Sequence, residues 1–142
     1  MAFDFKKENE DDIFEVRESD IKYRIRLDER LFNFAVNVIK ILKTMKRSIE
    51  TDIVRYQLTK SVNSAGANYE EAQAASSRAN FKNKVDISLK EMLETNYWLR
   101  ILIATKMVDS VYIKPLVDES EQLKKILGSI AFKVSTKVNG KR

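Results

Sequence analysis

The chain of 142 residues has the usual size of one domain and is long enough to enclose one hydrophobic core. Its 44% apolar and 33% charged residues, with three glycines and one proline, favour helices over a sheet with many tight turns. The absence of cysteine and histidine excludes thiolate nucleophiles, a histidine base and the common transition-metal sites. No apolar run approaches the roughly 18 residues of a membrane span, and the start does not resemble a signal peptide, so we expect a cytoplasmic protein without a membrane partner.

Charge is divided unevenly along the chain. Residues 1–20 contain eight acids and three bases, whereas the remainder contains 23 bases and 13 acids, a net charge of +10. A basic domain attracts nucleic acid or anionic membrane, although lysine-rich helix surfaces also serve solubility alone. We expect residues 1–22 to form a flexible or loosely docked acidic arm. Such an arm could fold back over the basic surface and compete with an anionic ligand.

Apolar residues at helical spacing define the first predicted helix, over about residues 24–47. Its apolar stripe comprises Leu31, Ala35, Val38, Leu42 and Met45.

A second helix is predicted from a cap at Ser48 to about residue 76. Glu50 in its first turn is favourable against the helix dipole. The face that this helix turns toward its neighbours is predicted to follow Ile53, Tyr56, Gln57, Ser61, Ser64, Asn68, Glu71 and Ala75.

A turn over residues 76–80 and a cap at Asp109 or Ser110 delimit two further helices. The third runs to about residue 106, with a stripe of Phe81, Val85, Ser88, Met92, Thr95, Leu99 and Leu102. Pro115 must lie close to the start of the fourth helix, because proline breaks a helix interior. The fourth stripe comprises Leu116, Leu123, Leu127, Ile130 and Val134. Short connections leave neighbouring helices antiparallel, so residues 23–138 are predicted to form an up-down-up-down four-helix bundle, with a basic tail over 139–142.

Two helices carry more apolar surface than one core can use. Large exposed apolar patches are uncommon on monomers, so the surplus predicts a homo-oligomer. If one helix meets a different helix of the next subunit, the contact is head-to-tail and a closed ring results. The alternative is that Trp98 and Phe32 widen the monomer core. The predicted interface residues are Phe32, Val36, Ile39, Ile87, Trp98 and Ile101.

Polar residues on the second and third helices suggest a half-buried network. It either holds a ligand or ion, or fixes the register of the two helices, and we favour the second. A di-iron site needs Glu-x-x-His pairs, and no histidine is available. The nearby glutamates are more simply interpreted as salt-bridge partners of Lys84 and Lys90 than as metal ligands. We therefore predict no metal, no cofactor and no catalytic centre. The network residues are Ser64, Asn68, Glu71, Lys84, Glu91 and Glu94.

Basic residues in the two middle helices and their connecting turn form a candidate phosphate-binding surface. They do not follow one helical stripe, because Lys82 and Arg100 share a direction while Lys84 points elsewhere. The pattern is equally typical of a solvated helix surface, and no sequence-specific reading of bases follows from it. The candidates are Arg55, Lys60, Arg78, Lys82, Lys84, Lys90 and Arg100.

Several stretches resemble one known family. They are Gln57-Leu58, the run from Ser61 to Asn68, Glu71-Ala72, Phe81 with Lys84, Lys90-Glu91, Glu94-Thr95, Tyr97-Trp98-Leu99 and Leu127-Gly128-Ser129-Ile130. Over about residues 21–134 the chain resembles the four-helix-bundle proteins named for intervening sequences in bacterial 23S ribosomal RNA genes. The acidic first twenty residues depart from that family.

The resemblance implies the same bundle, assembly into ring-shaped homo-oligomers such as pentamers, and a basic surface that contacts nucleic acid. A related group acts as accessory subunits of diversity-generating retroelements, where a basic ring is thought to meet RNA and reverse transcriptase. The family has no established enzymatic activity. We therefore predict a non-enzymatic oligomeric module that binds RNA or DNA through a basic surface. The alternative is a protein-protein interaction scaffold or an accessory subunit with a protein partner.

Overall fold

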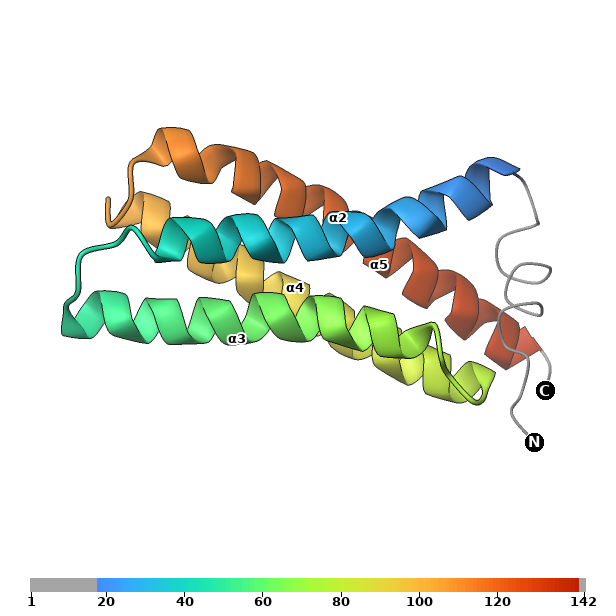
Figure 1. Ribbon diagram of the computed structural model, residues 1–142. Helices are drawn as coiled ribbons and strands as arrows, with labels where there is room; N and C mark the ends of the chain where they lie inside the picture. The colour runs from blue at the N-terminus through green and yellow to red at the C-terminus, as the bar shows by residue number, and fades with distance from the viewer. Residues whose placement is uncertain (1–17, 141–142) are drawn as a thin grey trace.

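The structure, a computed structural model, describes the backbone of residues 18–140 and the side chains of residues 27–136. Within that range the chain forms four helices and no strand: α2 (Glu18–Leu42), α3 (Ile49–Ala72), α4 (Arg78–Ala104) and α5 (Ser110–Gly140). Successive helices run in opposite directions and are joined by short turns (Figure 1). The prediction of an all-α four-helix bundle is confirmed. None of the four helices combines the length and the apolar character needed to cross a bilayer.

The ends of the chain differ in part from the predicted boundaries. Helix α2 begins at Glu18, so the last residues of the predicted acidic arm are helical, while residues 1–17 lie outside the described range. Helix α5 continues to Gly140, into the predicted basic tail, whose last two residues are also outside that range.

Serine caps start the two middle helices. The Ser48 hydroxyl accepts a hydrogen bond from the backbone N–H of Thr51, whose own hydroxyl accepts one from the N–H of Ser48. This reciprocal capping box confirms the predicted start of α3. Ser77 caps α4 by accepting from the N–H of Asn80, so α4 begins within the segment predicted to be a turn.

Pro115 is tolerated in α5 because it lies near the beginning of the helix. Only four residues separate it from Ser110, so the missing N–H removes one hydrogen bond of the first turns and leaves the long remainder of the helix intact. The Asp109 side chain accepts a hydrogen bond from the N–H of Val111 at 3.0 Å and so satisfies one of the free donors at this end.

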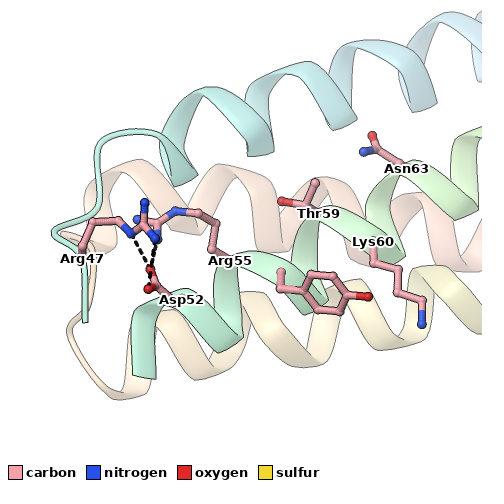
Figure 2. Close-up of a pocket in the computed structure, with 7 residues that line it drawn as sticks. Arg47, Asp52, Arg55, Thr59, Lys60 and Asn63 are labelled. Carbon is pink, nitrogen blue, oxygen red and sulfur yellow. Dashed lines mark hydrogen bonds and ion pairs between the residues drawn. The ribbon is translucent and has the colours of Figure 1, made fainter. Parts of the chain in front are cut away.

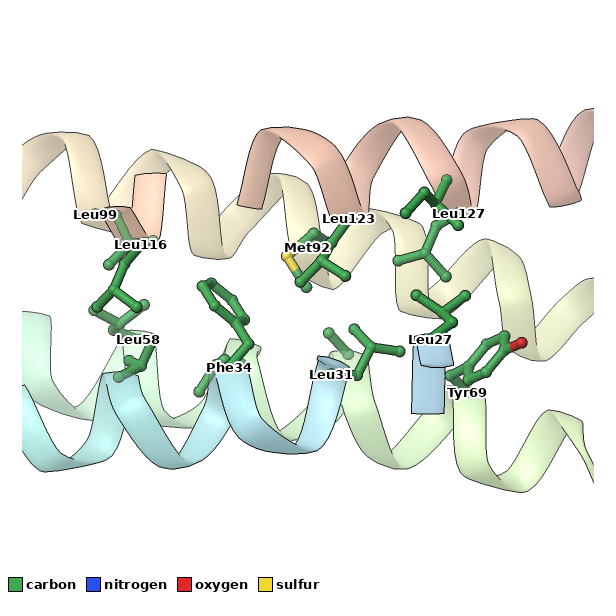
Figure 3. Packing of buried hydrophobic residues seen from close by; sticks show 14 of the residues in the cluster. Leu27, Leu31, Phe34, Leu58, Tyr69, Met92, Leu99, Leu116, Leu123 and Leu127 are labelled. Carbon is green, nitrogen blue, oxygen red and sulfur yellow. The ribbon is translucent and has the colours of Figure 1, made fainter. Parts of the chain in front are cut away.

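The core runs along the whole bundle between the four helices. Every residue of the stripes predicted for α4 and α5 is buried, as are those of α2 except the half-buried Ala35. Figure 3 shows large side chains from all four helices converging on this space. Those labelled there are Leu27, Leu31, Phe34, Leu58, Tyr69, Met92, Leu99, Leu116, Leu123 and Leu127.

The inner face predicted for α3 is wrong at most of its positions, because only Ser61 and Ala75 of the eight predicted residues are buried. Ile53 and Tyr56 are 53% and 64% exposed, and Gln57 is only half-buried. The true seam follows a neighbouring stripe that the prediction missed and that includes the large residues Val54, Leu58, Val62 and Tyr69. The residues that α3 buries are Thr51, Val54, Leu58, Ser61, Val62, Ala65, Tyr69 and Ala72.

Small side chains let α3 and α4 approach closely. The Ser88 hydroxyl donates to the backbone carbonyl of Ala65 at 2.6 Å, across the two helices. The Thr95 hydroxyl lies 2.9 Å from the hydroxyl of Ser61 and 2.8 Å from the carbonyl of Glu91. These polar groups are buried and hydrogen-bonded, which fixes the rotation of α3 against α4.

Candidate nucleic-acid interface

The seven basic residues predicted to contact phosphate do not form one surface. Arg78 is only 8% exposed, which leaves little of its side chain accessible to a phosphate. Lys82 pairs with Asp86 at 2.6 Å and Lys84 with Glu71 at 2.9 Å, which leaves both partly neutralised. The exposed members of the set are Lys60, Lys90 and Arg100.

The side chain of Arg55 is bonded to the turn between α2 and α3. Its guanidinium donates to the carbonyls of Leu42 and Met45 at 3.2 and 2.8 Å, and it pairs with Asp52 at 2.6 Å. These carbonyls lie at and just beyond the C-terminus of α2, where no intrahelical donor remains for them. Arg55 therefore holds the turn in place, and little of its hydrogen-bonding capacity is left for phosphate.

A set of lysines that the sequence patterns do not bring together gathers at one end of the bundle. The turn from α2 to α3 and the turn from α4 to α5 lie at the same end (Figure 1). Six basic residues on these turns and the adjoining helix ends are exposed. We call this set the basic end: Lys40, Lys43, Lys46, Arg47, Lys106 and Lys114.

The charge of the basic end is largely uncompensated. None of its five lysines has an ion-pair partner among residues 27–136; Arg47, by contrast, pairs with Asp52. Acidic residues at this end include Glu50 and Asp109, and both are exposed. Lysines without partners keep a compact charge on a flexible stem, which suits contact with phosphate groups.

An open pocket of about 390 Å³ lies along α3 and adjoins the basic end through Arg47. Figure 2 shows its lining side chains, with the guanidinium groups of Arg47 and Arg55 both paired with the carboxylate of Asp52. The hydrogen bond from Arg47 is the main cause that lowers the pKa of Asp52 and raises that of Arg47. We call this the α3 pocket; it is lined by Arg47, Asp52, Arg55, Tyr56, Thr59, Lys60 and Asn63.

The predicted polar network is divided into separate groups. Asn68 donates to the carbonyl and hydroxyl of Ser64 within α3, at 2.8 and 3.1 Å. The ion pair of Lys84 and Glu71 joins α4 to α3 near the C-terminus of α3. The hydroxyls of Ser61, Ser88 and Thr95, which were predicted as parts of the helix stripes, form the buried contacts between the two helices.

Glu91 and Glu94 lie beside each other near Lys60. Burial of Glu91, followed by the repulsion from Glu94, raises the pKa of Glu91, and the nearby Lys60 opposes that effect. Among the described residues no three acidic side chains lie close enough together to hold a metal ion.

The predicted interface residues differ in exposure. Phe32 is 67% exposed, whereas the other five are half-buried. Trp98 and Ile101 pack partly against the core of the bundle. Other large apolar side chains are also exposed, and the prediction did not include them: Ile49, Ile53, Tyr56, Leu93, Tyr97, Val111, Tyr112 and Phe132.

These features define an all-α four-helix bundle with a basic end and an adjoining open pocket. The chain belongs to the family of 23S rRNA-intervening sequence proteins, whose family model matches residues 25–129. A solved structure from Bacteroides thetaiotaomicron, a protein of unknown function from the S23 ribosomal protein family, is similar, with 36% identity and a TM-score of 0.65. The match covers 74% of this chain and 97% of that one. No functionally curated protein matches this chain.

Proposed function

We propose that this protein is a non-enzymatic module that binds RNA through the phosphate backbone, with the basic end as the contact surface. The observation that carries this proposal is the convergence of five unpaired, exposed lysines from two turns that are distant in sequence. Phosphates spaced along a nucleic acid match such a surface, and each lysine that neutralises one releases a bound counterion.

The family gives independent but weaker support. The family is named for the intervening sequences of 23S rRNA. The name therefore links these proteins to RNA through the position of their genes within rRNA genes. Location in such a gene does not by itself require RNA contact, so the charge at the basic end remains the main argument. Lysine contacts with phosphate position an RNA without reading its bases, so the proposed binding is not sequence-specific.

A salt series with a fluorescently labelled RNA that contains both duplex and single-stranded segments tests the proposal. At about 50 mM salt the protein should bind, and the affinity should fall steeply by about 200 mM because phosphate contacts release counterions. Absence of binding at about 50 mM salt would overturn the proposal. A stoichiometric protein partner that co-purifies from the host and survives nuclease treatment would then favour the scaffold alternative.

We also propose that the protein acts as a homo-oligomer, in a closed ring such as the pentamer implied by the family resemblance. The exposed Phe32 supports this, as do the half-buried Ile87 and Trp98, because water-soluble monomers seldom expose extensive apolar surface. In light scattering the wild type should exceed the mass of a 16.5 kDa monomer. Trp98→Asp or Ile87→Asp should lower that mass while circular dichroism remains helical. A monomeric wild type at micromolar concentration would contradict the proposal and leave Trp98 as a core residue.

A further inference from the structure

We infer that the α3 pocket receives an unpaired nucleotide, with the base stacked on Tyr56 and its phosphate held by Lys60 and Arg47, so that the protein prefers single-stranded RNA to duplex. This inference rests on the proposed function, since it names the form of RNA that the same surface selects. Three features of the pocket support it: an exposed aromatic ring, an excess of cations over acids in the lining, and two polar side chains that make no hydrogen bond within residues 27–136.

The ring of Tyr56 is available for stacking. Its side chain is 64% exposed on the outer side of α3, and the packing of the core does not account for its position. No aromatic or cation-π contact of this ring exists among residues 27–136. Every base offers a π-face, so an exposed ring beside cationic groups suits a single strand of any sequence.

The cations of the pocket exceed its acids. Three basic side chains and one acid line it, and Asp52 is already shared by Arg47 and Arg55. The side chain of Arg47 is 80% exposed, and Lys60 is exposed with no ion-pair partner among the described residues. These two groups can therefore approach a phosphate without first breaking a buried contact.

The remaining lining groups suit the polar edge of a base. The side chains of Thr59 and Asn63 make no hydrogen bond within residues 27–136, so their donors and acceptors are free for a ligand. A volume of about 390 Å³ lies within the usual range of small-molecule sites and is sufficient for one nucleotide.

The pocket is continuous with the basic end, because Arg47 belongs to both. An RNA whose phosphates lie on the lysines of the two turns can therefore place a neighbouring nucleotide beside Tyr56. In a duplex the bases are stacked and paired, and they cannot reach the ring without being unstacked. Single-stranded segments avoid that cost, which is the basis of the expected preference.

Binding of a labelled single-stranded RNA and of a blunt-ended two-strand duplex with the same number of phosphates, both at about 50 mM salt, tests the inference. Tyr56→Ala should weaken single-strand binding about ten-fold and change duplex binding little, because stacking contributes about 1–3 kcal/mol per base. Tyr56→Phe keeps the ring and should retain the wild-type affinity. Phe132→Ala removes another exposed aromatic side chain, in the second half of α5 and away from both the pocket and the basic end, and serves as the matched control.

The possible outcomes separate this inference from the proposed function. If the wild type binds both RNAs and Tyr56→Ala binds both as tightly as the wild type, the nucleotide site is overturned while backbone binding stands. An equal loss for single strand and duplex also overturns it, because stacking acts on unpaired bases alone. If the wild type binds neither RNA, both the inference and the proposed function are wrong. Thermal unfolding followed by circular dichroism confirms that each variant is folded.

Discussion

Glu91 is the residue whose surroundings link charge most directly to stability. One of its carboxylate oxygens is buried without a hydrogen-bond partner among the described residues, and Glu94 adds a like charge beside it. Both effects raise the pKa above the ordinary value of 4.5, against the opposing charge of Lys60. The folded state thus holds this proton more tightly than the unfolded chain does. The free energy of unfolding should therefore fall as the pH rises from about 4.5 through the raised pKa.

The variant Glu91→Gln removes this titration and keeps the size of the side chain. It should be more stable than the wild type at pH 7, and the difference should shrink as the pH falls toward 4.5. Urea unfolding at pH 4.5, 5.5 and 7, at one protein concentration, measures both curves. Glu70→Gln, an exposed position on α3, is the control and should follow the wild type. A Glu91→Gln curve parallel to that of the wild type would show that the carboxyl is well solvated.

Arg55 and Arg78 show why charge in a sequence does not identify a binding residue. Arg55 lies in a predicted helix and Arg78 in the predicted turn that follows it, and neither pattern nor spacing distinguishes them from Lys60. In the fold Arg78 is buried, and Arg55 donates to carbonyls of the preceding turn. Guanidinium groups bind several carbonyl and carboxylate oxygens in a fixed geometry, so they readily take structural roles. Only the tertiary arrangement separates such residues from those free to meet a ligand.

At the scale of the helices, α3 and α4 depend on small side chains at their contact. Ser88→Ala should cost about 0.5–1.5 kcal/mol, because the buried hydrogen bond to the Ala65 carbonyl is lost. Ser88→Leu should cost about 1–3 kcal/mol or more, since the added atoms must separate two closely packed helices. Chemical denaturation measures both changes in the free energy of unfolding.

The control for that series is Asn83→Leu, at an exposed position on the same helix. Its effect should stay within about 0.5 kcal/mol, as expected for a surface substitution away from special contacts. If Ser88→Leu were tolerated as well as Asn83→Leu, the contact between α3 and α4 would be looser than the hydrogen-bond distances indicate.

The difference between α3 and the later helices shows how much of the fold a single sequence predicts. Large apolar residues every three or four positions determine the buried faces of α4 and α5, and these were predicted correctly. On α3 two neighbouring apolar stripes compete: Val54, Leu58 and Val62 are buried, whereas Ile53 and Tyr56 lie on the surface. Helix pattern shows which residues share a face, but it does not choose between two adjacent faces that both carry apolar residues. The exposure of Tyr56, and with it the α3 pocket, is decided by tertiary packing.

At the scale of the whole molecule, topology creates the candidate site. Lys46 and Lys106 are separated by 60 positions in the sequence, and they meet at one end because the two turns lie there (Figure 1). The net charge of the chain predicts attraction to polyanions, but not where the unpaired charge gathers. A closed ring would present several copies of this end together, so weak contacts by each subunit would add up in avidity.

The most direct test of the account compares the salt dependence of RNA binding in two matched double variants. Lys46→Ala/Lys106→Ala removes two charges from the basic end, and Lys125→Ala/Lys133→Ala removes two exposed charges from α5. The first variant should bind more weakly, with a slope of log affinity against log salt reduced by about one for each lysine that contacts a phosphate. The second should keep the wild-type slope. Equal slopes in the two variants, or a larger loss in the second, would contradict the assignment of RNA binding to the basic end.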